Sequence, residues 1–398
     1  MKTAVQFGAG NIGRGLMGQL FQGSGYQPIF VESNRELVER LNDRGEYPLF
    51  LLDGYTRREI RLIISPVRAI GTGQEDAISE VISSCDAIST AVGVKSLPVI
   101  APLVARGLVN RFQNHRPPIN IFLCENRLDA ASLLHDVVLC HIPDEMKPEV
   151  EEKVGFVGMT VARMVPAPSS RLGIDDPLLV VADSYHTIPY DQKAIRGGEP
   201  IIAGLKPVVN FPAEVERKLF THNLGHATLA YLGYLKGYAY VHEPFQDPFI
   251  DPLFDQTLDE TTAALLRKYP GDILPEEQRE VRKDIKIRFG NPLIMDTVQR
   301  VGRDPLRKLG PEDRLVGGAH LCLSQGIFPA GIAYVCGAAL SYDFPGDEDA
   351  LALQRMIREN GLGQTLQAIS GIEPQSELGQ KVMASYADLQ EKRKDWVR

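Results

Sequence analysis

Three polar residues on one predicted helix could together handle a proton and a substrate oxygen. Lys218, Asn223 and His226 stand in the order K-x4-N-x2-H, just after Pro212. At about 100° and 1.5 Å per residue, Asn223 lies roughly 140° round an α-helix from Lys218, and His226 roughly 80° round. Because helical side chains lean toward the N-terminus and lysine is long, an amine, an amide and an imidazole can converge on one small polar substrate.

A general base for alcohol oxidation is one chemistry that these residue types could perform. Oxidising an alcohol with a nicotinamide cofactor needs a base for the hydroxyl proton and donors for the developing oxyanion. No tyrosine is followed by a lysine four residues on, and the scattered cysteines include no C-x2-C pair to indicate zinc. A lysine whose pKa is lowered by burial or by a nearby positive charge remains a candidate. The alternative is a surface lysine on a helix whose Asn and His are satisfied in the core.

The amino-terminal segment predicts the cofactor that such a base would need. Residues 8–13 read GAGNIG, a G-x-G-x-x-G pattern that directly follows a predicted strand at residues 3–7 and opens a predicted helix. Glycines in this pattern permit a tight turn and close approach of the backbone to a pyrophosphate, and the helix N-terminus offers N–H groups to the phosphates. The predicted cofactor contacts in this turn are Gly8, Gly10, Asn11, Ile12 and Gly13.

Further contacts are predicted where other strands end. Glu32 closes the second predicted strand, where its carboxylate would accept hydrogen bonds from ribose and repel a 2′-phosphate. This favours NAD over NADP, although Arg35 is close by. Thr90 and Val92 follow a later strand, where they contact the cofactor or form an ordinary strand end. Asn126 follows another strand and either points into the same crevice or caps the next helix.

The arrangement of these elements predicts two domains in the 398-residue chain. Strand-like and helix-like segments alternate over the first 140 residues, which is typical of an α/β, Rossmann-like doubly wound sheet. Amphipathic helical stretches dominate after Pro212. We therefore expect an NAD-binding domain with an extra β-rich segment at 1–209, followed by a mainly α-helical substrate and catalytic domain at 210–398.

Composition excludes some classes of partner. The net charge of −8 argues against a nucleic-acid footprint or an anionic membrane surface. The N-terminus has the pattern of a strand, not of a signal peptide, and no apolar run of about 18 residues occurs. The odd number of scattered cysteines fits reduced thiols. These features predict a cytoplasmic protein with a small-molecule substrate, as a monomer or small homo-oligomer.

The segment VERKLFTHNLGHATLAYLGYLKGY resembles the signature of the polyol-specific long-chain dehydrogenases, the mannitol dehydrogenase family. Supporting segments are QFGAGNIGRG (6–15), LCENR (123–127) and RFGNPLIMDTVQRVGRDPLRKLGPEDRLVG (288–317). The resemblance implies NAD-dependent, metal-independent interconversion of D-mannitol 1-phosphate and D-fructose 6-phosphate. It also implies that Lys218 is the general base, that Asn223 and Asn126 hold the reacting oxygen, and that His226 contacts the substrate.

Substrate identity depends on less regular parts of the sequence. A basic run predicts a phosphate site because arginine can clamp phosphate, although a solvated helix face is the alternative. Its members, with one weaker candidate from the RFGNP segment, are Arg300, Arg303, Arg307, Lys308 and Arg288. Ala162 replaces the acidic residue of the family's VDRIVP pattern, and the segment at His186 also differs. The competing hypotheses are therefore a dehydrogenase of an unphosphorylated polyol or hexuronate, and a catalytically silent NAD-binding protein.

Overall fold

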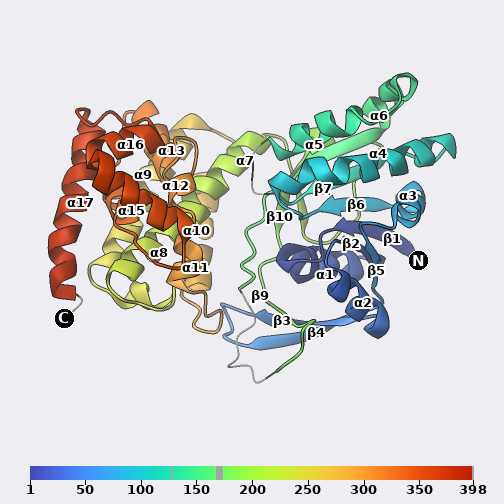
Figure 1. Cartoon of the computed structure of the whole chain (residues 1–398), viewed down its shortest axis with the longest axis horizontal. Helices are drawn as coiled ribbons and strands as arrows, with labels where there is room; N and C mark the ends of the chain where they lie inside the picture. The colour runs from blue at the N-terminus through green and yellow to red at the C-terminus, as the bar shows by residue number, and fades with distance from the viewer. Residues whose placement is uncertain (126, 128, 167–173, 397–398) are drawn as a thin grey trace. The chain divides into compact units, whose positions relative to one another are not determined.

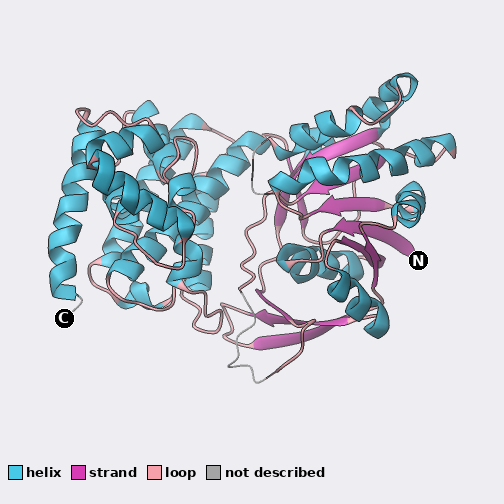
Figure 2. Cartoon of the chain, in the orientation of Figure 1, coloured by secondary structure: helices cyan, strands magenta, loops and turns pink. Residues whose placement is uncertain are grey.

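The computed structural model describes residues 1–125, 127, 129–166 and 174–396. The chain divides into two units, Met1–Glu214 and Val215–Arg398, and the boundary falls within helix α7 (Phe211–Arg217). All the strands that the structure describes belong to the first unit, and the described part of the second unit is built from helices (Figure 2).

The first unit is organised by a six-stranded parallel sheet with the order β5-β2-β1-β6-β7-β8 (Figure 1). Val5 of the central strand pairs with Ile29 on one side and with Ile88 on the other, so the chain extends outward from β1 in both directions. This reversal creates a switch point between β1 and β6, where the carboxyl ends of parallel strands leave a crevice for a ligand. The strands are β1 (Lys2–Phe7), β2 (Tyr26–Glu32), β5 (Arg68–Gly71), β6 (Ala87–Thr90), β7 (Ile119–Leu123) and β8 (Val154–Gly158).

Helices cover both faces of this sheet, which confirms the doubly wound prediction. Alternate residues of a strand point to opposite faces, so Val31 packs with one set of helices and Phe30 with the other. One face carries α3 (Glu75–Ser84), α4 (Leu97–Gln113) and α5 (Ala130–Leu139). The other face carries the π-helical segment η1 (Gly13–Met17), α1 (Gly18–Gly23) and α2 (Arg35–Arg44). Helix α6 (Lys147–Lys153) leads into β8.

Two smaller sheets make up the extra β-rich part. An antiparallel hairpin is formed by β3 (Tyr47–Leu52) and β4 (Glu59–Ile64). Strand β9 (Val180–Asp183) then joins β3 in parallel, with Leu49 opposite Val180. A separate parallel pair is formed by β10 (Ile188–Asp191) and β11 (Leu205–Val208). The sequence pattern indicated β-like runs here but could not indicate which strands pair.

The described part of the second unit confirms the helical stretches expected after Pro212 and contains short helices and a carboxyl-terminal pair besides them. Its helices after α7 are α8 (Leu224–Leu235), α9 (Ile250–Lys268), α10 (Pro275–Phe289), α11 (Val298–Gly302), α12 (Pro305–Lys308), α13 (Val316–Ser324), α14 (Ala330–Leu340), α15 (Glu348–Asn360), α16 (Leu362–Ser370) and α17 (Glu377–Trp396). The sequence pattern did not predict α11, α12, α16 or α17. Among the described helices, none combines the length and the apolar character that a membrane span needs.

Helices α8 and α14 form the centre of this unit. All residues of α8 are buried except His226 and Tyr234, and all residues of α14 are buried except Ala330 and Tyr334. A helix that is apolar on every side must be surrounded by other helices. The helix that carries His226 is therefore enclosed by its neighbours on nearly every side.

The packing of α3 against α4 predicts the effect of adding one methyl group. A Cβ at Gly107 would lie 2.4 Å from the Cβ of Ile82, so we expect Gly107→Ala to lower the free energy of unfolding by about 1–3 kcal/mol. Urea unfolding measures this loss. In Gly23→Ala the new Cβ meets no atom within 4 Å, so stability should be unchanged or slightly higher. Equal stability of the two variants would contradict the described packing.

Candidate functional site

The glycine turn after β1 has the close backbone contacts that a dinucleotide fingerprint requires. Gly8 has φ +87°, and a Cβ there would lie 2.6 Å from the carbonyl oxygen of Ala91. A Cβ on Gly13 would lie 2.0 Å from the carbonyl oxygen of Gly8. No heavy atom lies within 4 Å of the Cβ position of Gly10, so the backbone there borders open space. The turn therefore fits close approach of a pyrophosphate.

The helix that follows this turn differs from the prediction in one respect. Residues 11–23 were expected to form one α-helix, but Gly13–Met17 is π-helical before α1 begins at Gly18. The exposed Asn11 donates from Nδ2 to the carbonyl oxygen of Val165 at 3.3 Å, and Ile12 is partly buried. Segments of π-helix occur frequently at functional sites because the wider turn changes the direction of side chains.

Glu32 is held against the glycine turn by hydrogen bonds. Its Oε2 accepts from the Ala9 amide at 2.8 Å, while Oε1 accepts from the amides of Ser33 and Asn34 at 2.8 and 2.9 Å. Desolvation alone would raise the pKa of Glu32, but the hydrogen bonds from the Asn34 and Ala9 amides and from Ser33 lower it. An ionised carboxylate is thus fixed beside the fingerprint, where the adenosine ribose is expected.

Glu125, which the sequence pattern did not single out, links the ends of β6 and β7. The hydroxyl of Thr90 donates to Glu125 Oε2 at 2.6 Å, and the amide of Val92 donates to Oε1 at 3.0 Å. Thr90 is completely buried, so its hydroxyl is directed at Glu125. The predicted Asn126 lies outside the described residues.

In the second unit, the segment that carries Lys218 and Asn223 is not a regular α-helix. Lys218–Asn223 is π-helical, and the amide of Leu224 donates to the carbonyl oxygen of Leu219, five residues back. The angular offsets expected for an α-helix are therefore wrong for these residues. The chain still continues as one helical rod into α8, which carries His226.

The pKa of Lys218 is lowered to about 7, first by desolvation and then by the positive charge of Arg314, while Asp313 opposes the change. Part of the Lys218 side chain remains exposed, whereas its ammonium group is the part that has lost contact with water. Arg314 is itself buried, and its Nε donates to Asp313 Oδ1 at 2.7 Å. A lysine in this environment exists in both protonation states near neutral pH.

Asn223 has an unsatisfied donor. Its side chain is 6% exposed, and Nδ2 has no hydrogen-bond partner among the described residues. A buried amide without a partner costs about 1–3 kcal/mol, so such a group is usually matched by ordered water or has a functional role. Nδ2 is therefore available to a substrate oxygen.

His226 lies between an aromatic ring and a carboxylate. Its ring stacks on Phe289 with the centroids 4.5 Å apart, and Nε2 lies 3.3 Å from Asp296 Oδ2, although not aligned for a regular hydrogen bond. Asp296 also accepts from Nε and Nη2 of Arg300, both at 2.5 Å. Burial lowers the pKa of His226, although the nearby carboxylate of Asp296 acts to raise it. Sequence reasoning missed Asp296, although its four-residue separation from Arg300 is an ion-pair spacing.

A second histidine lies beside these groups. The His222 ring packs edge-on against Phe289, with the centroids 4.9 Å apart, and lies 6.0 Å from the His226 ring. Burial and then Arg288 lower the pKa of His222 well below its usual value, with smaller contributions from His226 and Lys218. His222 is therefore a neutral imidazole near neutral pH. The sequence offered no signal for it beyond its position next to Asn223.

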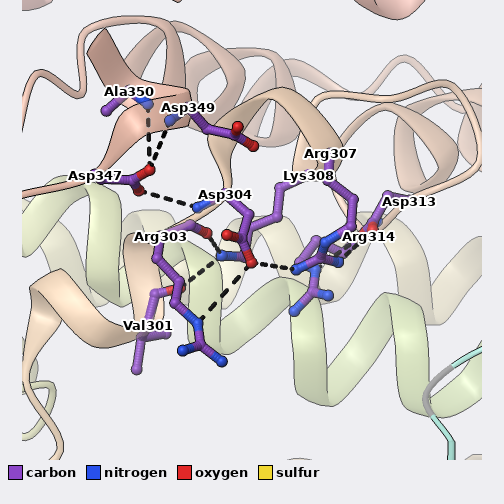
Figure 3. A network of polar contacts seen from close by, with 10 residues as sticks. All are labelled: Val301, Arg303, Asp304, Arg307, Lys308, Asp313, Arg314, Asp347, Asp349 and Ala350. Atoms are coloured by element: carbon purple, nitrogen blue, oxygen red, sulfur yellow. Dashed lines mark hydrogen bonds and ion pairs between the residues drawn. The ribbon is translucent and has the colours of Figure 1, made fainter. Parts of the chain in front are cut away.

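The predicted basic run is divided between two environments. Arg300 and Arg288 lie within electrostatic range of His226 and His222, respectively. Lys308 instead donates from Nζ to the carbonyl oxygens of Val301, at 2.9 Å, and Arg303 (Figure 3). Burial, followed by the charges of Arg314 and Arg307, lowers the pKa of Lys308 to about 6.

The remaining members of the run face acidic residues. Arg307 pairs with Asp313 at 2.8 Å and with Asp304 at 3.3 Å (Figure 3). Arg303, with 64% of its side chain exposed, lies 3.9 Å from Asp304. The Asp304 amide in turn donates to Asp347, which caps α15. This network connects the loop after α11 with Arg314, and through it with the electrostatics of Lys218.

The segment that departs from the family pattern is anchored by Arg163. This buried side chain donates to the carbonyl oxygens of Gly15 at 2.7 Å and of Tyr185 at 2.5 Å. The neighbouring Ala162 is partly buried, and the exposed His186 contacts the carbonyl oxygen of Ser184 through Nδ1 at 3.0 Å. The described residues contain no cluster of three or more His, Cys, Asp or Glu side chains that could hold a metal ion.

Known proteins similar to this chain support the family resemblance seen in its sequence. The Mannitol dehydrogenase Rossmann domain family matches residues 2–204, and the Mannitol dehydrogenase C-terminal domain family matches residues 212–391. Mannitol-1-phosphate 5-dehydrogenase of Geobacillus thermodenitrificans is 37% identical over 390 residues, covering 97% of this chain and 99% of that protein. The Bacillus subtilis protein of the same name is 38% identical over 371 residues, covering 93% of this chain and 95% of that protein.

Solved structures show the same fold at low identity. Pseudomonas fluorescens mannitol 2-dehydrogenase, solved as a ternary complex with NAD and D-mannitol, matches with a TM-score of 0.78 at 18% identity, covering 99% of this chain and 93% of that one. A D-sorbitol dehydrogenase matches with a TM-score of 0.78 at 17% identity, covering 99% of this chain and 94% of that one.

The buried Asp296 predicts a pH-dependent contribution to stability. Desolvation would raise its pKa, but the close contact with His226 and the hydrogen bonds from Arg300 lower it from 3.8 to about 2. Because the folded pKa lies below the unfolded one, the carboxylate stabilises the fold by about 2 kcal/mol above pH ~4, and this is lost as pH falls toward 2. The difference in urea unfolding between wild type and Asp296→Asn should therefore shrink over this range. Asp43→Asn, at an exposed position of α2, is the control and should show no such trend.

Proposed function

The chain belongs to the mannitol dehydrogenase family, and we propose that it is an NAD-dependent polyol-phosphate dehydrogenase that interconverts D-mannitol 1-phosphate and D-fructose 6-phosphate. The enzyme class, an oxidoreductase acting on CH–OH groups, follows from the family and its relatives. The observation that carries the chemical proposal is Lys218, whose pKa of about 7 coincides with an unpaired Asn223 donor on the same helical rod. The names of the relatives support the phosphorylated substrate.

Each part of the chain has a separate task in this proposal. Residues 1–209 bind the cofactor, and residues 210–398 supply the catalytic and substrate-binding groups. Gly8, Gly10 and Gly13 would hold the pyrophosphate, and Glu32 would accept hydrogen bonds from the adenosine ribose, since its carboxylate is fixed beside the turn. When bound, NAD supplies the hydride acceptor or donor of the reaction.

Lys218 is the proton-transfer group. In alcohol oxidation its neutral amine takes the hydroxyl proton, and in ketone reduction its ammonium group returns that proton. A pKa near the working pH lets one residue do both, and here desolvation and Arg314 produce that value. An unperturbed lysine, with a pKa near 10.4, would be almost entirely protonated at pH 7 and could not act as the base.

Asn223 and His226 orient the substrate. The unpaired Nδ2 of Asn223 would donate to the reacting oxygen, where negative charge develops during oxidation. His226 is fixed by Phe289 and Asp296, so its ring can contact the substrate at a defined angle. Asn126 is proposed as a second donor to the reacting oxygen, on the family pattern alone.

Arg300 is the best-placed phosphate ligand of the basic run. Two of its nitrogens bind Asp296, which leaves further N–H donors on a side chain that is 35% exposed. Arg288 is the second candidate because it faces His222. Lys308 satisfies backbone carbonyl oxygens, while Arg303 and Arg307 face acidic residues, so we assign these three to the α11–α12 network.

The lysine assignment predicts a specific pH dependence. Lys218→Ala should lower kcat by at least about 100-fold while NADH still binds, because general-base catalysis typically contributes 10²–10⁴-fold. In wild type, polyol oxidation should rise through pH ~7 as Lys218 loses its proton. Arg314→Gln removes a positive charge, which should raise the pKa of Lys218 and move this rise to higher pH.

Rate profiles measured between pH 5.5 and 9.5 test this prediction. The exposed Arg279 of α10 provides a matched control, and Arg279→Gln should leave the profile in place. A Lys218→Ala enzyme that keeps its activity would exclude Lys218 as the base.

The phosphate assignment predicts a selective loss of affinity. Arg300→Gln should raise KM for fructose 6-phosphate by about 10- to 100-fold, since a hydrogen bond to a charged group contributes about 1.5–3 kcal/mol. Any activity with fructose should change much less. Arg303→Gln is the comparison, and an equal loss in that variant would instead favour the whole basic run as the phosphate site.

One substrate panel distinguishes the proposed reaction from its alternatives. NADH oxidation should be followed with fructose 6-phosphate, fructose, fructuronate and tagaturonate at equal concentrations. A preference for fructose 6-phosphate supports the proposal, whereas a preference for fructose or a hexuronate would replace it with the unphosphorylated alternative. NADH binding without turnover of any of the four would favour a catalytically silent NAD-binding protein.

A further inference from the structure

The carboxylate of Glu125 links the ends of two neighbouring strands of the parallel sheet. Glu125 is 5% exposed, and among the described residues each of its carboxylate oxygens has a hydrogen-bond donor. Oε2 accepts from the hydroxyl of Thr90, the last residue of β6, and Oε1 accepts from the amide of Val92, two residues further on. Glu125 itself follows β7, so one side chain fixes both strand ends.

These strand ends belong to the half of the sheet that is left for the nicotinamide end of the cofactor. In a doubly wound sheet the dinucleotide binds across the switch point, with one mononucleotide on each half. Glu32 at the end of β2 marks the adenosine half, on the β5-β2-β1 side of the order. The β6-β7-β8 half, where Thr90 and Glu125 lie, is therefore the nicotinamide half.

The segment held by Glu125 also packs against the glycine turn. The Cβ position of Gly8 lies 2.6 Å from the carbonyl oxygen of Ala91 and 3.3 Å from Cγ1 of Val92. The Ala91 amide donates to the carbonyl oxygen of Phe7 at 2.9 Å. Movement of Ala91 or Val92 would therefore disturb the turn that binds the pyrophosphate.

We propose that Glu125 is a positioning residue for the cofactor. Its two hydrogen bonds hold Thr90 and Val92, and through them the turn at Gly8, in the arrangement that binds a nicotinamide dinucleotide. Loss of the carboxylate leaves the buried Thr90 hydroxyl and the partly buried Val92 amide without an acceptor. The two groups can then find new hydrogen-bond partners only if the strand ends move. The inference rests on the proposed function only in taking NAD(H) as the ligand.

Fluorescence titration of the full chain with NADH tests this proposal without any need for turnover. Glu125→Ala should raise the Kd for NADH by about tenfold or more, equivalent to the 1–3 kcal/mol expected for an unsatisfied group. Glu125→Gln should stay within about threefold of wild type. Its amide oxygen can accept from Val92, and its NH₂ can donate to the Thr90 hydroxyl, which also accepts. Rescue by glutamine would show that hydrogen bonding, not the negative charge, is what positions the cofactor edge.

A matched buried carboxylate separates this role from general destabilisation. Glu260 of α9 accepts from the amides of Gly331 at 2.7 Å and Ile332 at 3.1 Å, in the helical unit. Glu260→Ala should lower the thermal midpoint yet leave the Kd for NADH unchanged. If Glu125→Ala binds NADH as tightly as wild type, or if both alanine variants weaken binding equally, the proposal is wrong.

Thr90→Val decides the question if Glu125→Ala does not fold. It removes one donor and should raise the Kd for NADH by about tenfold, because Oε2 of Glu125 then loses its partner. An unchanged Kd in Thr90→Val would refute the positioning role. Wild-type protein that binds no NADH would instead refute the proposed function, so the two failures are distinguishable.

Discussion

The desolvated ammonium group of Lys218 beside Arg314 is the constraint on which the proposed chemistry of the helical unit depends. Bringing a cation out of water and next to another cation costs free energy. Because this cost applies only to the protonated form, it lowers the pKa of the lysine. Such a group stays in place only if its helix cannot move toward solvent. The rod that begins with Lys218 continues into α8, which is buried on nearly every side, and Asp313 fixes Arg314.

Both units use a short π-helical segment at the position where function is expected. One segment begins at Gly13, at the end of the glycine fingerprint, and the other begins at Lys218. A wider turn is less favourable than α-helix and persists only where surrounding packing imposes it. In each unit the π-helical segment runs directly into a helix of the core, α1 or α8, so a rigid support follows the irregular turn.

Buried and partly buried carboxylates organise the two units in different ways. In the first unit Glu32 accepts hydrogen bonds mainly from backbone amides, and Glu125 accepts from one amide and one hydroxyl, so both fix the chain at the ends of strands. In the second unit Asp296 and Asp313 bind arginine side chains, and so they set the positions of positive charges around Lys218 and His226. The first arrangement suits recognition of a cofactor by backbone groups, and the second suits control of proton transfer.

The sequence by itself determined the features that depend on near neighbours in the chain. These are the glycine fingerprint, the alternation of strands and helices over the first 140 residues, and the K-x4-N-x2-H spacing, because turns and periodicity are local properties. Tertiary structure alone decided that Thr90 binds Glu125, that Lys308 binds carbonyl oxygens, and that Asp296 joins His226 to Arg300. Lys308 and the Asp296–Arg300 pair use partners that are near in the sequence, whereas Thr90 with Glu125 and Asp296 with His226 join residues that are far apart. The energies of all these contacts depend on burial that no local pattern reveals. The identity of the chemical groups was therefore written in the sequence, whereas their pKa values and partners were set by the packing around them.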